Sequence, residues 1–300
     1  MLTAAGGLEP RLTWNLVQDV RQTLEFPFMV NAFRAGFIVA VLSGLVGWFM
    51  VLRRESFAGH TLAIVGFPGA AGAVLIGVSA TYGLFAFALV AAVLIGVTRG
   101  SGGRGYGAQP AVIGTIQAFA LACGFLFVNI YGGFLSGTTA LLFGSFLGIT
   151  PDQVAVLAVV AVIVSIVLAA IARPLLFASV DADVAQARGV PVRILSITFL
   201  VLLGCAAAEV SQMTGTLLVF ALLVVPAATA QVWTPRPFAS AVLTVVIGVC
   251  VTWLSLFAAY YSSSYPIGFF LTSFAFAAYL LANGWRRLRD HPASRPGALV

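Results

Sequence analysis

Hydrophobic residues follow one another in long continuous runs along this chain, and they show neither the spacing of a surface helix nor strict alternation. Runs of about 18 residues or more are typical of transmembrane helices, because about 20 helical residues cross the hydrocarbon core of a bilayer. We therefore predict an all-α integral membrane protein, a polytopic helical bundle of about nine spans. The expected spans are 28–52, 59–77, 84–98, 111–130, 153–172, 194–208, 216–232, 238–258 and 269–281.

Three segments interrupt the apolar pattern. Residues 100–107 are rich in glycine and read as a loop. Residues 131–150 are too polar for an ordinary span and too apolar for a free loop, so we expect a half-helix or re-entrant piece packed against protein. The longest polar insert is 179–193, which contains Asp181, Asp183, Arg188 and Arg193.

The first 27 residues carry several charges and lack the apolar core of a cleavable signal peptide. The expected organisation is an N-terminal interfacial segment at 1–27, a transmembrane domain at 28–284 and a cytoplasmic tail at 285–300.

Composition agrees with a membrane protein, because 61% of the 300 residues are hydrophobic and only 8% are charged. That leaves too few polar residues to cover a soluble fold of this size. The net charge of +6 comes from arginines that lie mostly between spans, which indicates the positive-inside rule and not a nucleic-acid partner. Counting turns alternately puts the N-terminus outside and the C-terminus inside a cell membrane.

Few ionisable side chains fall inside or between the spans, and an ionisable group in a membrane is costly. His60 lies in the second span, where it either offers an imidazole to a metal or caps the helix. Glu209 lies in an external turn, apart from other charges, where it either meets a cation or pairs with Arg34 of the first span. By span order, His60 and Glu209 are expected at opposite ends of the membrane.

The remaining polar side chains in spans have an ordinary explanation. Gln117, Asn129 and Gln212 fit hydrogen bonds between helices, although each is also a candidate for a metal path. Cys123, Cys205 and Cys250 have no CxxC spacing and read as buried thiols. The chain has no lysine, which excludes a Walker-type phosphate loop, so we expect no ATPase site of its own.

Four stretches together resemble the zinc and manganese permease family of ATP-binding-cassette importers. They are VLRRESFAG at 51–59 followed by Pro68-Gly69, LFGS at 142–145, DADVAQARGVP at 181–191, and GTLLVFALLVVPAATA at 215–230. The resemblance implies a permease subunit that moves zinc or manganese, or iron, with ATP hydrolysed by a partner ATPase and no tightly bound cofactor. It also implies an extracytoplasmic metal-binding protein and a second permease chain as partners.

The third stretch resembles the segment that couples such permeases to their ATPase. Its residues Asp181, Asp183, Ala185, Arg188 and Gly189 predict a short cytoplasmic coupling helix. Acidic side chains favour the N-terminus of a helix and glycine commonly follows its C-terminus.

One departure from the family pattern affects the expected metal ligands. The second span of such permeases usually carries an aspartate and, four residues later, a histidine shortly before Pro-Gly. Here His60 stands at the aspartate position and Ile64 at the histidine position, and Gln109 replaces an acidic residue that often opens the fourth span. The expected path residues are therefore His60 and Glu209 as metal ligands, aided by Gln212 and Asn129.

Three other readings remain open. A permease for a chelated metal, such as a siderophore or cobalamin, would need few ionic ligands. An ion channel or secondary transporter leaves the polar insert unexplained. An intramembrane enzyme would need a cluster of acids, bases or metal ligands, and the sequence offers too few.

Overall fold

The computed structural model describes residues 15–98, 108–131, 144, 148–216, 218–262 and 265–290, and within these ranges the only regular elements are helices. The helices are α1 (Leu16–Leu24), α2 (Pro27–Leu52), α3 (Ser56–Leu75), α4 (Ala80–Thr98), α5 (Ala108–Tyr131), α7 (Pro151–Val180), α8 (Ala182–Ala187), α9 (Val192–Thr214), α10 (Val219–Trp233), α11 (Pro237–Tyr261) and α12 (Ile267–Asp290).

Each predicted span coincides with one helix, which confirms the polytopic helical bundle. Eight described helices are long and apolar enough to cross a membrane, and α10 is a shorter apolar helix of 15 residues. The expected half-helix at 131–150, including most of the LFGS stretch, lies largely outside the described residues. The glycine-rich loop at 100–107 also lies outside them.

Three helices extend well beyond their predicted ends. We expected the sixth span to end at residue 208 with Glu209 in a turn, but α9 continues to Thr214, so Glu209 lies inside a helix. We expected the fifth span to end near Arg173-Pro174, but α7 continues through Pro174 to Val180. That boundary is wrong because an internal proline removes one backbone hydrogen bond and crowds one carbonyl, and the residues after it remain free to stay helical. Similarly, α12 runs to Asp290, past the expected end of the ninth span at residue 281.

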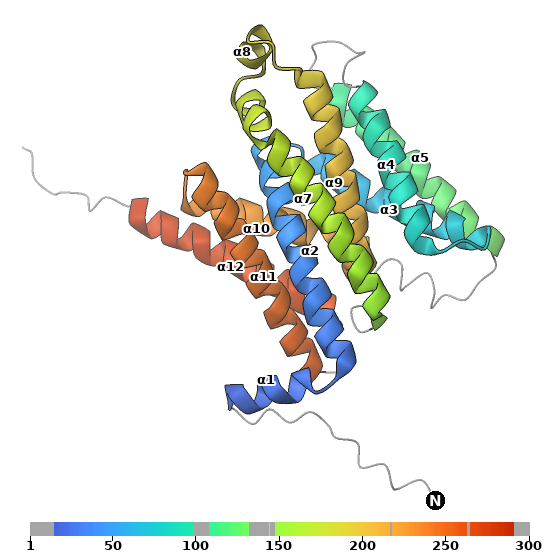
Figure 1. Ribbon diagram of the computed structural model, residues 1–300, viewed down its shortest axis with the longest axis vertical. Coiled ribbons are helices and arrows are strands. Elements are labelled where there is room, and N and C mark those ends of the chain that lie inside the picture. Colours follow the sequence, from blue (N-terminus) through green and yellow to red (C-terminus); the bar gives the residue numbers. More distant parts are fainter. Residues whose placement is uncertain are drawn as a thin grey trace, which may run out of the picture.

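The helices form three groups, which Figure 1 shows side by side. The helices α2, α7 and α9 stand in the middle, α3, α4 and α5 pack together on one side, and α10, α11 and α12 on the other. Helix α2 joins the groups, because it contacts α7, α9, α10 and α11. Its buried positions include many alanines and glycines, which let neighbouring backbones come close.

A close backbone approach joins α3 to α4 through two glycines. A Cβ atom added at Gly69 would collide with the carbonyl oxygen of Gly83, and one added at Gly83 would collide with the carbonyl oxygen of Gly69. Neither position therefore accepts a side chain without separating the helices. This contact gives a physical reason for the glycine in the Pro68-Gly69 pair.

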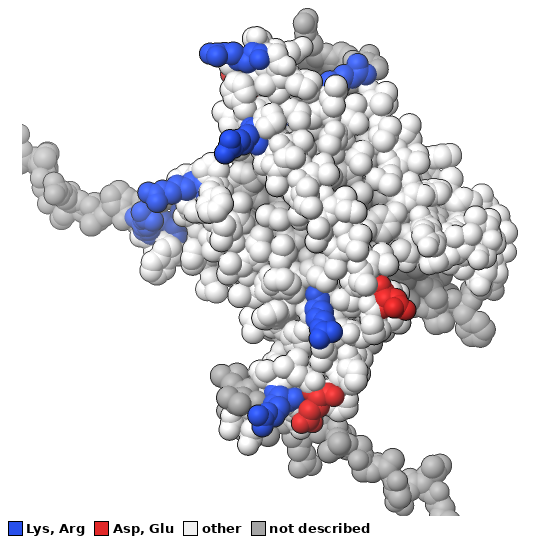
Figure 2. Space-filling view, in the orientation of Figure 1, with Lys and Arg blue, Asp and Glu red and all other residues white. Residues whose placement is uncertain are grey.

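The two ends of the bundle differ in charge. Helix α8 lies at one end and α1 at the other (Figure 1). Figure 2 shows a visible face that is uncharged over most of its area. Several arginine side chains lie at the end that carries α8, whereas arginine and acidic side chains lie together at the α1 end (Figure 2). A broad uncharged face is expected where helices meet lipid, and the excess of arginine at the α8 end agrees with a cytoplasmic position for α8. The chain is a multi-pass membrane protein.

Candidate functional site

The polar insert forms the predicted short helix, α8. The side chain of Asp181 caps it, since its Oδ1 accepts a hydrogen bond of 2.9 Å from the backbone N–H of Val184. Gly189 follows the helix with φ of +82°, which suits glycine. Ala185 is fully buried, whereas Asp183 and Arg188 are exposed. The insert therefore anchors on one buried alanine and presents charged side chains outward.

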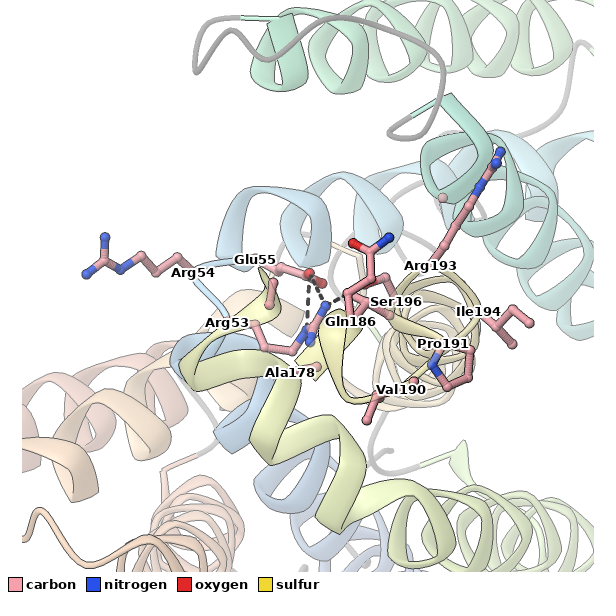
Figure 3. Close-up of a pocket in the computed structure, with 14 residues that line it drawn as sticks. Arg53, Arg54, Glu55, Ala178, Gln186, Val190, Pro191, Arg193, Ile194 and Ser196 are labelled. Carbon is pink, nitrogen blue, oxygen red and sulfur yellow. Dashed lines mark hydrogen bonds and ion pairs between the residues drawn. The ribbon is translucent and has the colours of Figure 1, made fainter. Parts of the chain in front are cut away.

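A hollow of about 890 Å³ opens beside α8 (Figure 3). It lies between α8, the start of α9 and the turn that joins α2 to α3. Its lining residues are Arg53, Arg54, Glu55, Gly96, Ala178, Ala182, Gln186, Gly189, Val190, Pro191, Val192, Arg193, Ile194 and Ser196. Residues far apart in the sequence thus share one surface at the end of the bundle that carries α8.

Arg53 connects three helices at the floor of this hollow. Its guanidinium lies 3.1 Å from Glu55 Oε1 and donates to Ser179 Oγ of α7 at 3.2 Å and to Ser196 Oγ of α9 at 2.9 Å. It also lies over the ring of Phe199. The side chains of Arg53 and Glu55 are 9% and 6% exposed, so solvent screens this pair little.

Glu209 is fully buried near the far end of α9 from α8. Neither carboxylate oxygen has a hydrogen-bond partner among the residues that the structure describes. Arg34, the partner considered from the sequence, is exposed on α2 and makes no ion pair with Glu209. The pairing of Arg34 with Glu209 is therefore not observed, and the carboxylate is left with hydrogen-bonding capacity for another ligand.

Gln212 follows Glu209 by three residues and lies on a neighbouring part of the same helix face. Its Oε1 accepts a hydrogen bond of 3.3 Å from Thr81 Oγ1 of α4. Its Nε2 is buried without a hydrogen-bond partner in the described part of the chain. The half of α9 away from α8 thus carries two buried polar side chains with unused hydrogen-bonding groups.

His60 lies one turn inside α3 and does not cap that helix. Glu55 is the N-cap residue, and no side-chain hydrogen bond caps the end. The half-buried imidazole packs edge-on against Phe220 of α10, with ring centroids 5.3 Å apart. The capping explanation for His60 is therefore not observed, and the ring lies where α3 meets α10.

His60 and Glu209 are neither at opposite ends of the bundle nor in one site. A Cβ atom at Gly59 would lie 3.7 Å from the side chain of Leu203, and one at Gly66 would lie 3.9 Å from that of Ser211. Helices α3 and α9 therefore run in the same direction, with Gly59 level with Leu203. His60 is then level with position 204 of α9, five residues or about 7.5 Å of helical rise before Glu209. However, at about 100° per residue, Glu209 lies on the side of α9 opposite these α3 contacts.

The other two polar candidates have different surroundings. Gln117 of α5 accepts a hydrogen bond of 2.8 Å from Thr61 Oγ1 of α3, which matches the expected link between helices. Asn129 is exposed on α5, so it faces away from the interior of this chain. Among the described residues, no three histidine, cysteine or acidic side chains gather into a group that could hold a metal ion.

Sequence reasoning missed the partners of Arg53. The stretch at 51–59 was singled out as a motif, but Ser179 and Ser196 are 126 and 143 residues away from Arg53. A serine in an apolar run has too many ordinary explanations to be paired from sequence alone. Thr61 and Thr81, which bind the two glutamines, escaped notice for the same reason.

Known proteins resemble this chain over most of its length. The profile of the ABC 3 transport family matches residues 25–283. The manganese import system permease protein ScaB of Streptococcus parasanguinis is 29% identical over 262 residues, which cover 84% of this chain and 92% of that protein. The manganese transport system membrane protein MntC of Halalkalibacterium halodurans is 28% identical over 236 residues, covering 78% and 80%.

The fold has a counterpart among solved structures. The structure of PsaBC from Streptococcus pneumoniae in complex with Fab superposes with a TM-score of 0.79 and 24% sequence identity. The match covers 92% of this chain and all of the matched chain. This likeness establishes a shared arrangement of helices.

Proposed function

This chain belongs to the ABC 3 transport family, and we propose from it that the protein is the permease subunit of an ATP-driven importer for a divalent metal ion. Manganese is the first substrate to test, because ScaB is named a manganese import permease and MntC a membrane protein of a manganese transport system. Zinc and iron are the next substrates in that test, since the same oxygen and nitrogen ligands accept them.

The observation that carries the proposal is the extent of the family match. Residues 25–283 include every membrane helix from α2 to α11, the short helix α8 and most of α12. A match of that extent includes the parts that a permease needs, namely the spans and the segment between α7 and α9. An ion channel or secondary transporter would leave α8 unexplained.

The same assignment implies partners, and α8 supports the first of them. Because this chain contains no lysine for a phosphate loop, a separate ATPase would hydrolyse the ATP. It would bind the end that carries α8, where the exposed polar segment lies (Figure 1). An extracytoplasmic metal-binding protein would deliver the ion at the α1 end, and a second permease chain would complete the pathway. We expect that second chain to be another copy of this one.

Glu209 is the residue that we propose as the main ligand of the passing ion. A buried carboxylate in a membrane protein is costly unless a cation or a proton compensates its charge. Gln212 would add an amide oxygen, and His60 would meet the ion separately, nearer the α8 end. Asn129 would join the path only if its exposed face of α5 lies against the second permease chain. Sparse ligands suit transport, since the ion has to leave again.

A second candidate function is import of a chelated metal, and Ile64 favours it. Ile64 is 8% exposed and apolar at the position where the family resemblance implies a histidine. A chelate brings its own ligands, so a pathway for it would need fewer ionic side chains. The two functions differ in which form of the metal crosses the membrane.

Reconstitution tests both. The permease and its ATPase are reconstituted in liposomes, and the binding protein is added on the opposite side of the membrane from the ATPase. These liposomes should transport free manganese only when ATP is supplied on the side of the ATPase. Uptake of zinc and iron under the same conditions ranks the three metals. If no free ion enters but a metal–siderophore complex does, the chelate function replaces the first. If neither enters while the ATPase binds, the metal assignment is wrong.

A further inference from the structure

Arg54 occupies a backbone position that normally belongs to glycine. Helix α2 ends with the N–H of Glu55 bonded to the carbonyl of Met50 at 2.9 Å and the N–H of Arg54 bonded to that of Val51 at 3.1 Å. In this turn, Arg54 has a φ of +57°. This left-handed position after a helix is usually glycine, because a Cβ atom there strains the backbone.

The chain follows the usual rule a short distance away. At the end of α8, the N–H of Val190 bonds to the carbonyl of Ala185 at 3.0 Å, and the residue between them in the turn, Gly189, has φ of +82°. Among the described residues other than glycine, Arg54 alone has a positive φ. Both residues line the same hollow. Backbone strain at one of two equivalent turns indicates that the side chain at that turn has a use.

The charges that line the hollow are unevenly satisfied. Arg53 forms an ion pair with Glu55. The other two arginines that line the hollow are Arg54 and Arg193. Both are exposed, and neither forms an ion pair or a hydrogen bond through its side chain within the described ranges. Figure 3 shows them extending in different directions from the rim of the hollow. The rim therefore offers two separate cationic groups to whatever covers it.

We propose that this hollow, with Arg54 and Arg193 on its rim, is a second docking surface for the ATPase, and that it receives acidic side chains of that partner. This inference rests on the proposed function, which supplies an ATPase partner. Ala182, Gln186 and Gly189 of the α8 segment also line the hollow, so a protein that binds α8 would cover it. The surface carries both signs of charge, since the α8 segment presents Asp183 and Arg188 while the rim presents two arginines.

This charge arrangement restricts how the partner docks. An ATPase surface would need basic or neutral groups opposite Asp183 and acidic groups opposite Arg54 and Arg193. A complementary pattern of both signs fixes orientation and disfavours wrong partners more than it adds affinity. We therefore assign the arginine rim to selecting the orientation in which the ATPase binds.

The variant Arg54→Gly tests the proposal, because it separates stability from binding. Removal of the strained side chain should raise the melting temperature of the detergent-solubilised protein by about 1–3 °C. Loss of the guanidinium should weaken ATPase binding about threefold at about 50 mM salt. Arg193→Gln should have a similar effect on binding, and the two together about tenfold. At about 0.5 M salt the differences should nearly vanish.

Arg236→Gln is the matched control, since Arg236 is an exposed arginine in the turn before α11 and does not line the hollow. It should bind the ATPase like the parent. Arg54→Glu should weaken binding more than Arg54→Gly, and an acidic-to-lysine change on the ATPase should restore it.

Two results would overturn the proposal. One is parental ATPase affinity in Arg54→Gly and Arg193→Gln at low salt, in protein that is folded by its melting curve. The other is a loss seen only in vesicles that contain anionic lipid and absent in detergent, which would identify a lipid headgroup as the occupant. The ATPase-binding assay needs no metal, so its result is valid even if the metal proposed as the substrate is wrong. A parent that binds no ATPase overturns both this inference and the proposed function.

Discussion

Arg53 and Ser196 are joined by a 2.9 Å hydrogen bond, although 143 residues separate them in the sequence. The same guanidinium reaches Ser179, so the ends of α2 and α7 and the start of α9 are held by one side chain. Because α8 lies between α7 and α9, a movement of α8 would reach α2 through this arginine. Arg53 therefore links the predicted docking segment to the core of the bundle.

Replacing Arg53 by methionine should destabilise the protein. The change leaves Glu55 buried without its guanidinium, which costs about 3 kcal/mol for a buried pair. The thermal midpoint in detergent should fall by about 5–10 °C. The double variant Arg53→Met with Glu55→Met should recover most of this loss, because it removes both charges. A single variant that melts with the parent would show that the pair contributes no stability.

Changing Glu209 to glutamine should reduce metal uptake at least about tenfold, equivalent to about 1.4 kcal/mol, because the amide no longer compensates the charge of a cation. The folded protein should be as stable as the parent or more so, because a buried charge without a hydrogen-bond partner costs at least about 2.5 kcal/mol in a membrane. Uptake and melting curves together give the answer. Asp152→Asn, at the exposed start of α7, is the matched acid-to-amide control.

His60→Ala should lower uptake less than Glu209→Gln, because the ring is half-buried against Phe220 and stands apart from Glu209. Initial uptake rates of manganese and zinc at equal protein levels provide the comparison. Parental rates in both variants would rule out this pair of ligands. The chelated-metal function would then be the better explanation.

The α8 segment allows capping and docking to be separated. Asp181→Asn should keep the cap, because asparagine accepts the same hydrogen bond, whereas Asp181→Ala should lose about 1 kcal/mol of local helix stability. Asp183→Ala and Gly189→Ala should both reduce recovery of the ATPase on co-purification, the first through charge and the second through strain at φ of +82°. Hydrogen exchange across α8 measures the local stability. Undiminished ATPase recovery with all of these changes would exclude α8 as a docking helix.

The orientation of the chain is open to a direct test. The arginine clusters between and after the spans predict a cytoplasmic C-terminus, and the odd number of predicted spans then puts the N-terminus outside. A reporter that works only in the cytoplasm should be active when fused after Arg289. If a reporter that works only outside the cell is active at this position and the cytoplasmic reporter is not, the predicted orientation of the C-terminus is reversed.

The spans and α8 could be predicted from the sequence because each is determined locally. A membrane helix has to satisfy its backbone within one apolar run, so the run itself marks the helix. The limits of α8 follow from a capping aspartate, Asp181, and a left-handed glycine, Gly189. The helix end predicted near Pro174 is wrong, because a proline inside a helix resembles a helix end in sequence, and α7 continues past it.

The candidate site could be predicted only in part, since it depends on how helices pack. The sequence singled out Glu209 as an isolated acid, but its complete burial follows from the surrounding helices. Likewise, the register between Gly59 and Leu203 decides how far His60 lies from Glu209, and no local pattern reports it. The strain at Arg54 also needs a backbone angle that a sequence does not display.

Pro174 lies inside α7, six residues before its end. It divides the 30-residue helix into a segment of about 35 Å and a final segment of about 10 Å, which passes into α8 through the single residue Asp181. No longer linker lies between α7 and α8 to absorb a displacement. A movement of α8 would be passed to the final segment of α7, and Arg53, bonded to Ser179 in that segment, would pass it on to α2. Because a proline removes one backbone hydrogen bond, Pro174 marks the point of α7 where such a movement would bend the helix.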